Sequence, residues 1–186
     1  MSEPAEPSEV KRRRWRLGPL LYVIPTIAIL LAIFSYYKYT YPYGWSHCCE
    51  QQLSLSLRHY AEEHKGWFPR GEATPEASLS LLAKNDPYWV NMMRGKSIGI
   101  ELVQARLSKG QLLTPEMCGW HYVEGLRLGD DPRLALFWDK VGLGHNGERL
   151  SRGGHAVISV SGSSYFVSGA DWDEFLLEQE RLRPKR

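Results

Sequence analysis

Cysteine and histidine are the side chains of this sequence best suited to chemistry, and several of them stand close together. The only cysteines are Cys48, Cys49 and Cys118. One interpretation is a disulfide between Cys49 and Cys118, which would close a loop of roughly 70 residues and contribute roughly 4 kcal/mol. A second interpretation is three buried thiols. A third is a metal site with His47 and His121, because the Cys118-x-x-His121 spacing suits a pair of zinc ligands.

A glycine-rich loop holds the other candidate ligands. Residues 142–147 read Gly-Leu-Gly-His-Asn-Gly, which matches a dinucleotide-binding fingerprint by letter. That fingerprint needs a helix that opens on its last glycine, and residues 148–154 are too short and too rich in glycine to form one. The sequence therefore predicts no nucleotide site. His145, Glu148 and His155 would either bind a divalent cation or belong to a solvated polar loop.

The rest of the sequence offers no recognisable catalytic machinery, since it contains neither a nucleophile elbow nor a zinc-protease helix motif. We therefore predict no catalytic residues and no cofactor, and we predict that the protein is not an enzyme. The charge argues against nucleic acid as a partner. The net charge is +2, and the excess of basic residues lies before residue 17. The remainder lacks the broad positive field of a nucleic-acid-binding protein.

An uncharged hydrophobic segment, Leu17 to Tyr37, stands near the N-terminus. As a helix, it would span about 30 Å, the hydrocarbon thickness of a bilayer. Five basic residues come directly before it and only Lys38 directly after it. By the positive-inside rule, the N-terminus is then cytoplasmic and the rest of the chain lies outside. We predict a membrane-spanning helix in preference to a cleaved signal peptide or a buried core helix.

These features divide the chain into four parts: a basic and mostly disordered leader (1–16), a transmembrane helix (17–37), a juxtamembrane linker (38–45) and one extracytoplasmic domain (46–186). The last part has the size of one ordinary domain. It opens with Ser46, a plausible helix N-cap, and an apolar stripe follows that predicts a long helix, although local alternation also permits a strand. The stripe consists of Cys49, Leu53, Leu57, Tyr60 and His64, and Gly66 and Pro69 end the element.

Capping residues and periodicity predict the remaining elements. Thr74-Pro75-Glu76 has the pattern of a helix start, and residues 99–108 form a further amphipathic helix. Asp171 and Glu174 have the spacing of a capping box before a C-terminal helix. Short β-branched and aromatic runs separated by turns predict an antiparallel sheet of about four strands. These runs are His121–Leu126, Leu134–Trp138, Ala156–Val160 and Tyr165–Val167. The expected fold class is α+β.

Three segments together carry the pattern of a known family. They are Cys49–Leu53 with Leu57, Tyr60, Gly66 and Pro69; Cys118 and Tyr122 with Gly125-Leu126, Asp131-Pro132 and Trp138-Asp139; and His145 with Gly153–Val157 and Gly162–Val167. The chain thereby resembles the bacterial pilin-like proteins related to type II secretion pseudopilins, in the subgroup with a histidine before a C-terminal Asp-Gly hairpin. It diverges from them, because Gly18 is followed by Pro19 and no prepilin cleavage site is recognisable.

The resemblance implies a pilin-like fold at the bacterial inner membrane. Residues 17–37 would contact the lipid bilayer, and the domain would act through contacts with membrane or secretion-assembly proteins. We predict such a structural or interaction protein. The alternative is a membrane-tethered extracytoplasmic metal-binding module or enzyme that uses the Cys/His cluster, with Cys118, His121, His145 and His155 as candidate ligands. A third hypothesis is a ligand-sensing domain whose basic leader contacts a cytoplasmic partner.

Overall fold

The computed structural model describes residues 18–45, 50–84, 90–150 and 152–184. The chain divides into two compact units, Met1–Tyr37 and Lys38–Arg186. The predictions for the basic leader, for the cap at Ser46 and for the candidate ligands at 47–49 lie outside the described residues.

Helix α1, Gly18–Thr40, is apolar and contains Pro25. Among the residues that the structure describes, it is the one helix long and apolar enough to cross a membrane. A signal sequence near the N-terminus passes the same test of length and composition. The helix continues through Thr40, beyond the end predicted at Tyr37. A turn then ends it, in which the Gly44 N–H donates to the Tyr41 carbonyl at 3.0 Å.

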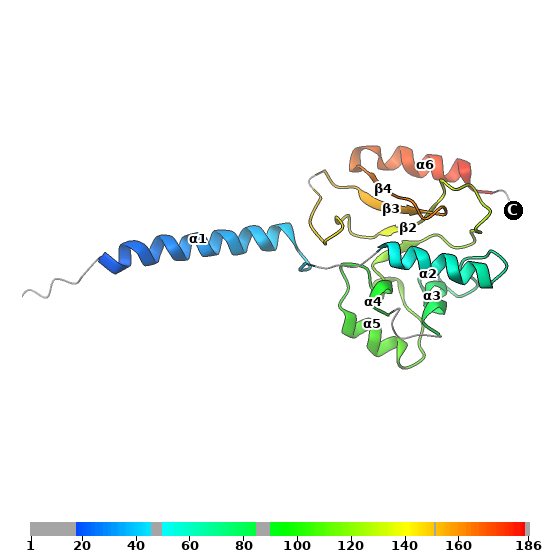
Figure 1. Ribbon diagram of the computed structural model, residues 1–186, viewed down its shortest axis with the longest axis horizontal. Helices are drawn as coiled ribbons and strands as arrows, with labels where there is room; N and C mark the ends of the chain where they lie inside the picture. Colours follow the sequence, from blue (N-terminus) through cyan, green and yellow to red (C-terminus); the bar gives the residue numbers. More distant parts are fainter. Residues whose placement is uncertain (1–17, 46–49, 85–89, 151, 185–186) are drawn as a thin grey trace, which may run out of the picture. The chain divides into compact units, whose positions relative to one another are not determined.

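The second unit is α+β, as the sequence predicts. Its helical elements come before and after the strands (Figure 1). They are α2 (Glu50–Glu63), α3 (Pro75–Leu79) with the 3-10 turn η1 (Ser80–Lys84), α4 (Val90–Met93), α5 (Ile100–Leu107), the 3-10 turns η3 (Pro115–Met117) and η4 (Gly169–Asp171), and α6 (Trp172–Leu182). The strands are β1 (Trp120–Tyr122), β2 (Ala135–Asp139), β3 (His155–Ser159) and β4 (Ser164–Val167).

The four strands form one antiparallel sheet in the order β1-β2-β3-β4. The first strand ends at Tyr122, earlier than predicted, because Gly125 adopts a φ of +86° in the turn that follows. An irregularity in β2 separates Ala135 from Phe137. There the Ala135 N–H donates to the side-chain oxygen of Gln179 at 2.7 Å, so α6 supplies the partner that the ladder lacks.

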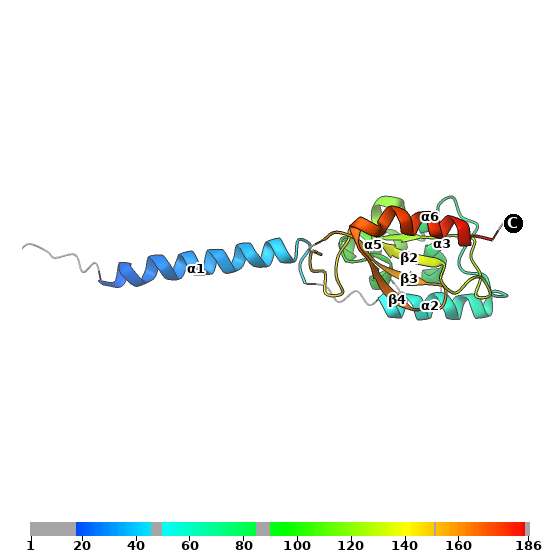
Figure 2. The same ribbon diagram turned by 90° about the horizontal axis from the view of Figure 1, so that it is seen from above.

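The sheet has a hydrophobic cluster on each face. One cluster includes Leu53 and Leu57 of α2 with Phe137 and Ile158 of the sheet. The other joins strand residues to Phe175 of α6. In Figure 1 the sheet accordingly lies between α6 and α2, and in Figure 2 α6 lies over the strands. The C-terminal helix that the sequence predicts is therefore present, and it packs on the sheet through Phe175.

Helix α2 confirms the helical interpretation of its segment and corrects one detail of the stripe. Leu53 and Leu57 are buried. His64, in contrast, is exposed and stacks on Tyr60, with ring centroids 3.7 Å apart. The helix ends before Gly66, whose N–H donates to the Ala61 carbonyl at 2.7 Å. Its φ of +83° favours glycine at a helix C-terminus.

One predicted N-cap is confirmed and one is wrong, although both helices begin where the sequence predicts. Thr74 caps α3, because its hydroxyl accepts the Ala77 N–H at 3.1 Å. Asp171 precedes α6, but its side chain makes no cap hydrogen bond. Instead, it accepts a hydrogen bond from the Ser168 hydroxyl at 2.6 Å. With φ −97° and ψ 1°, Asp171 ends a 3-10 turn and lacks the extended backbone that an N-cap requires.

Candidate functional site

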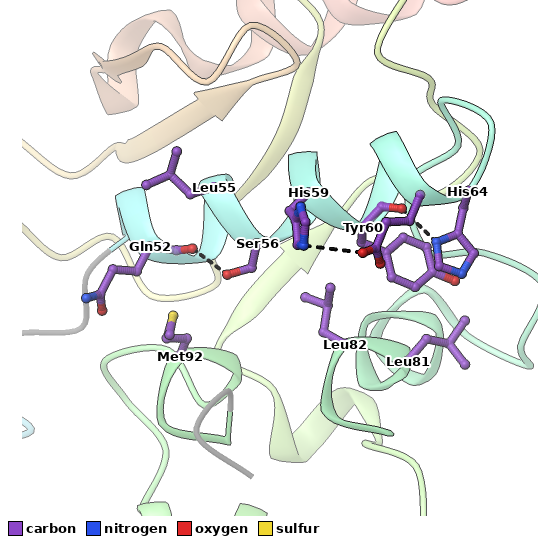
Figure 3. Close-up of a pocket in the computed structure, with 10 residues that line it drawn as sticks. Gln52, Leu55, Ser56, His59, Tyr60, His64, Leu81, Leu82 and Met92 are labelled. Atoms are coloured by element: carbon purple, nitrogen blue, oxygen red, sulfur yellow. Dashed lines mark hydrogen bonds and ion pairs between the residues drawn. The ribbon is translucent and has the colours of Figure 1, made fainter. Parts of the chain in front are cut away.

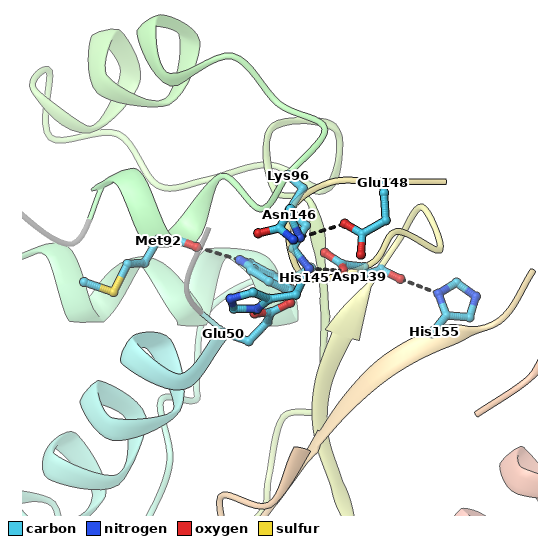
Figure 4. Close-up of polar contacts among 9 residues, drawn as sticks. Glu50, Met92, Lys96, Asp139, His145, Asn146, Glu148 and His155 are labelled. Carbon is cyan, nitrogen blue, oxygen red and sulfur yellow. Dashed lines mark hydrogen bonds and ion pairs between the residues drawn. The ribbon is translucent and has the colours of Figure 1, made fainter. Parts of the chain in front are cut away.

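A buried lysine joins two carboxylates inside the second unit. Lys96 Nζ contacts Glu50 Oε1, and it lies 3.1 Å from Asp139 Oδ2. The Lys96 side chain is 0% exposed, and those of Glu50 and Asp139 are 6% and 2% exposed. Figure 4 shows the three side chains converging from α2, from the turn after α4 and from the end of β2. We call Glu50, Lys96 and Asp139 the buried charge cluster.

Two glycines explain how the lysine enters the core. Gly95 has a φ of +67°, a left-handed conformation that turns the chain just after α4. Gly119 packs against the same turn, and its N–H donates to the Arg94 carbonyl at 3.0 Å. A Cβ on Gly119 would lie 2.5 Å from that carbonyl oxygen. This close backbone approach carries Lys96 to β1 and β2, where Asp139 ends its strand.

Burial and charge act in opposite directions on the cluster. Burial raises the pKa of Asp139 from 3.8 to about 7, although Lys96 lowers it. Burial lowers the pKa of Lys96, but Asp139 and Glu50 together outweigh burial and raise that pKa above 10.5. At neutral pH the lysine is therefore charged, whereas Asp139 is divided between carboxylic acid and carboxylate.

Two of the predicted histidines lie beside the buried charge cluster. His145 Nδ1 is 3.2 Å from Glu50 Oε2, and the His145 side chain is 61% exposed. His155 Nδ1 is 2.7 Å from the backbone oxygen of Asp139, and its ring lies 4.2 Å from that of Trp172. A carbonyl only accepts, so Nδ1 of His155 carries the proton. Burial lowers the pKa of His155.

The loop between β2 and β3 does not assemble its predicted cation ligands. Glu148 Oε2 accepts the Asn146 N–H at 2.8 Å, within its own loop. His145 and His155 contact different atoms of the buried charge cluster. Across the described ranges, no group of three or more His, Cys, Asp or Glu side chains is arranged to hold a metal ion.

The predicted metal-ligand pair Cys118 and His121 lies in two different environments, with Cys118 in the interior and His121 at the surface. Cys118 is 1% exposed, and its Sγ lies 3.3 Å from the Met93 carbonyl oxygen. Burial raises its pKa to about 12. His121 is exposed on β1, and its ring centroid lies 5.4 Å from that of Trp138. Cys49 lies outside the described residues, so the disulfide between Cys49 and Cys118 stays a prediction.

An open groove of about 550 Å³ lies between α2 on one side and η1 and α4 on the other. Leu55, Ser56 and Tyr60 line it from α2, while Leu82 of η1 and Met92 of α4 line it from the opposite side (Figure 3). Leu55 is 66% exposed. We call this feature the α2 groove. It offers an apolar surface that the described chain leaves open to solvent.

The rim of the α2 groove is polar. Glu63 lies along it, and Glu62 is its neighbour on α2. The side chains of these two residues are 60% and 62% exposed. His59 lies within 4.0 Å of both, with Nε2 3.4 Å from Glu63 Oε1. The groove therefore combines an apolar floor with an acidic edge.

The chain matches no family model, no curated protein and no solved structure. The functional argument therefore depends on the residues and their geometry.

Sequence reasoning missed all three members of the buried charge cluster as site residues. They are far apart in the chain: Lys96 is separated from Glu50 by 46 positions and from Asp139 by 43. The one local signal is Asp139, an acid that directly follows the apolar run Leu134–Trp138. A charge at the end of a buried strand needs a partner, but the sequence does not say which lysine supplies it.

Proposed function

We propose that the protein is a membrane-anchored, pilin-like interaction protein. Helix α1 holds it in the bacterial inner membrane with the N-terminus in the cytoplasm. The domain outside binds a partner protein of a secretion or pilus-related assembly through the α2 groove. The open, apolar groove is the observation that carries this proposal.

The order of elements supports the pilin-like part of the proposal. An apolar N-terminal helix is followed by α2, which packs on a four-stranded antiparallel sheet. This is the order that the family resemblance implies. Helix α6 adds a cover on the second face of the sheet. That cover leaves α2 and its neighbours as the side through which such a domain would meet a partner.

The chemistry of the α2 groove indicates the kind of partner. A groove with an apolar floor suits the apolar face of an amphipathic helix. Glu63 places negative charge at the edge, and opposite charge on the partner favours encounter. The expected ligand is therefore a helix of a membrane-assembly protein, with an apolar face and flanking lysine or arginine.

Site-specific cross-linking in intact cells tests this function. A photoreactive residue would replace Leu55 in the full chain, and the same residue would replace Leu102 of α5 as the matched control. Both leucines are surface residues, 66% and 58% exposed, but only Leu55 lines the groove. We expect a discrete adduct with another membrane protein from position 55 alone. Equal adducts from both positions, or none from position 55, would reject the proposal.

The alternative of a metal-binding module or enzyme gains no support from the described residues, and we do not propose it.

A further inference from the structure

The buried charge cluster holds an amine and two carboxyl groups in contact, away from water, without an evident use as a ligand site. We propose that Lys96 Nζ and Asp139 Cγ condense to an intramolecular amide bond, with Glu50 as the base. The cluster is then a self-modification site that ties the turn after α4 to β2. This inference does not depend on the α2 groove or on any partner.

Proximity is the first requirement, and the cluster meets it. Lys96 Nζ lies 3.1 Å from Asp139 Oδ2, in hydrogen-bond contact with the carboxyl that it would attack. Both side chains leave rigid positions, one after the Gly95–Gly119 contact and one at the end of a central strand. Well-oriented groups in one molecule react as if present at effective concentrations of about 10⁵–10⁸ M. A slow condensation needs only a part of this advantage.

Exclusion of water is the second requirement. Trp120 is fully buried and is the cross-strand partner of Asp139 in the β1–β2 ladder. Its indole N–H donates to the Met92 carbonyl at 2.6 Å, and its ring lies 5.2 Å from that of Phe137. These aromatic walls disfavour isolated charges. An amide replaces an ammonium and a carboxyl group by one neutral group, so burial favours the product.

The third requirement is a path for protons. Glu50 Oε1 contacts Lys96 Nζ, and Glu50 Oε2 lies 3.2 Å from His145 Nδ1. The exposed side of His145 then connects the buried carboxylate to solvent. Asp139 provides a second advantage, because burial raises its pKa to about 7 and keeps a fraction in the neutral form that an amine can attack.

The atoms of the step balance without a further reagent. Glu50 takes one proton from the Lys96 ammonium, and the free amine attacks Cγ of protonated Asp139. The N–C bond forms, the C–OH bond breaks, and the hydroxyl leaves as water with a second proton from the nitrogen. One hydrogen stays on the amide nitrogen. The proton on Glu50 passes through His145 to solvent.

The roles of the two carboxyl groups follow from their surroundings. Glu50 has a titratable neighbour at the surface, so it suits proton transfer. Asp139 is held deeper, and its backbone oxygen is fixed by His155, so it suits the acceptor role. A second lysine provides an internal comparison: Lys140 Nζ lies 2.6 Å from Glu76 Oε1, but its side chain is 21% exposed and remains accessible to water.

Mass spectrometry of the full chain tests the inference. The chain would be purified in detergent, reduced and denatured, and its intact mass compared with that of the Lys96→Arg variant after allowing for the substitution. We expect the wild type to be lighter by one water. Trypsin should then yield a branched product that joins peptides 95–106 and 134–140. Lys140→Arg is the matched control and should keep the loss of water.

Glu50→Gln tests the role of the base while preserving the shape of the side chain. We expect this variant to fold and to retain the full mass, or to lose water at least tenfold more slowly. An unmodified wild-type mass would overturn the inference. So would a water loss with trypsin cleavage after Lys96 and an unbranched peptide 134–140, which indicates a cyclised aspartate, or a cross-link from Lys96 to peptide 39–58, which contains Glu50.

Discussion

Two lysines of the second unit contact carboxylates, yet their settings differ. Lys96 is fully enclosed with Glu50 and Asp139. Lys140 contacts Glu76 and also donates to the Pro115 carbonyl at 2.6 Å, with a side chain that is 21% exposed. Similar chemical groups therefore occur once in the protein interior and once at its boundary. The comparison indicates that solvent access matters more than which lysine and carboxylate are paired. It decides whether their contact only stabilises the fold, changes protonation with pH, or reacts.

The largest contrast should come from Lys96→Ala. Removing the Lys96 side chain leaves Glu50 and Asp139 as buried carboxyl groups with neither a cation nor an amide partner, so we expect a loss of about 3–5 kcal/mol in the free energy of unfolding. The loss is measured by urea unfolding of the full chain in detergent, with tryptophan fluorescence as the signal. A loss no greater than that of Lys140→Ala would show that the two settings are equivalent.

The second contrast concerns pH and uses Glu50→Gln, in which Asp139 should keep a free carboxyl group. Burial, the main cause of the raised pKa of Asp139, is retained in that variant. The folded pKa of about 7 exceeds the ordinary 3.8. This contribution to stability is therefore present at low pH and lost as pH rises through that window.

We expect Glu50→Gln to lose about 2–3 kcal/mol between about pH 4 and about pH 8, measured by urea midpoints. The double variant Glu50→Gln/Asp139→Asn lacks the Asp139 carboxyl group but keeps all other titrating groups. Its stability profile is therefore the baseline and should lack this slope. The wild type should also lack it if the amide has formed, because an amide has no such proton to lose. Parallel profiles for the single and double variants would contradict the raised pKa.

A smaller effect is expected from Lys140→Ala. The variant removes hydrogen bonds to Glu76 and Pro115 in a partly solvated setting, which we expect to cost about 1–2 kcal/mol. The same urea measurement applies, with Lys140→Arg as a control that keeps the charge. A loss as large as that of Lys96→Ala would mean that partial exposure does not lower the energetic cost of breaking the Lys140–Glu76 pair.

The smallest effect is expected at His155, next to the backbone of Asp139. Burial lowers its pKa below 6.5, so its contribution to stability is present above pH 6.5 and is lost as pH falls through the lower folded value. Because the ring is only half-buried, we expect a loss of about 0.5 kcal/mol on acidification. His155→Gln, which keeps a donor for Asp139, should reduce this loss in urea unfolding. An unchanged profile would assign the loss to His121, whose pKa burial also lowers.

Much of the fold could be predicted because its signals are local. Thr74 and Pro75 are neighbours that specify the start of α3, and the apolar spacing of residues 99–108 specifies α5. Local rules fail where a second neighbour competes for the same group. At Asp171, the hydroxyl of Ser168 takes the carboxylate that a capping box would use. Helix α4 was missed because one turn of helix leaves too short a pattern.

The candidate site could be predicted only at its edge. His145 and His155 were identified by residue type, and both lie beside the buried charge cluster. The cluster itself depends on Gly95 and Gly119 meeting through space. Neither glycine marks that contact in the sequence, since a glycine in a turn and a glycine before a strand have ordinary local explanations.

The position of Glu50 has a mechanical consequence. It is the first residue of α2. Through Lys96, Glu50 is coupled to Asp139 on β2, a strand with a neighbour on each side. A force applied to the start of α2 would therefore reach an interior strand of the sheet through side chains, independently of the order of the chain.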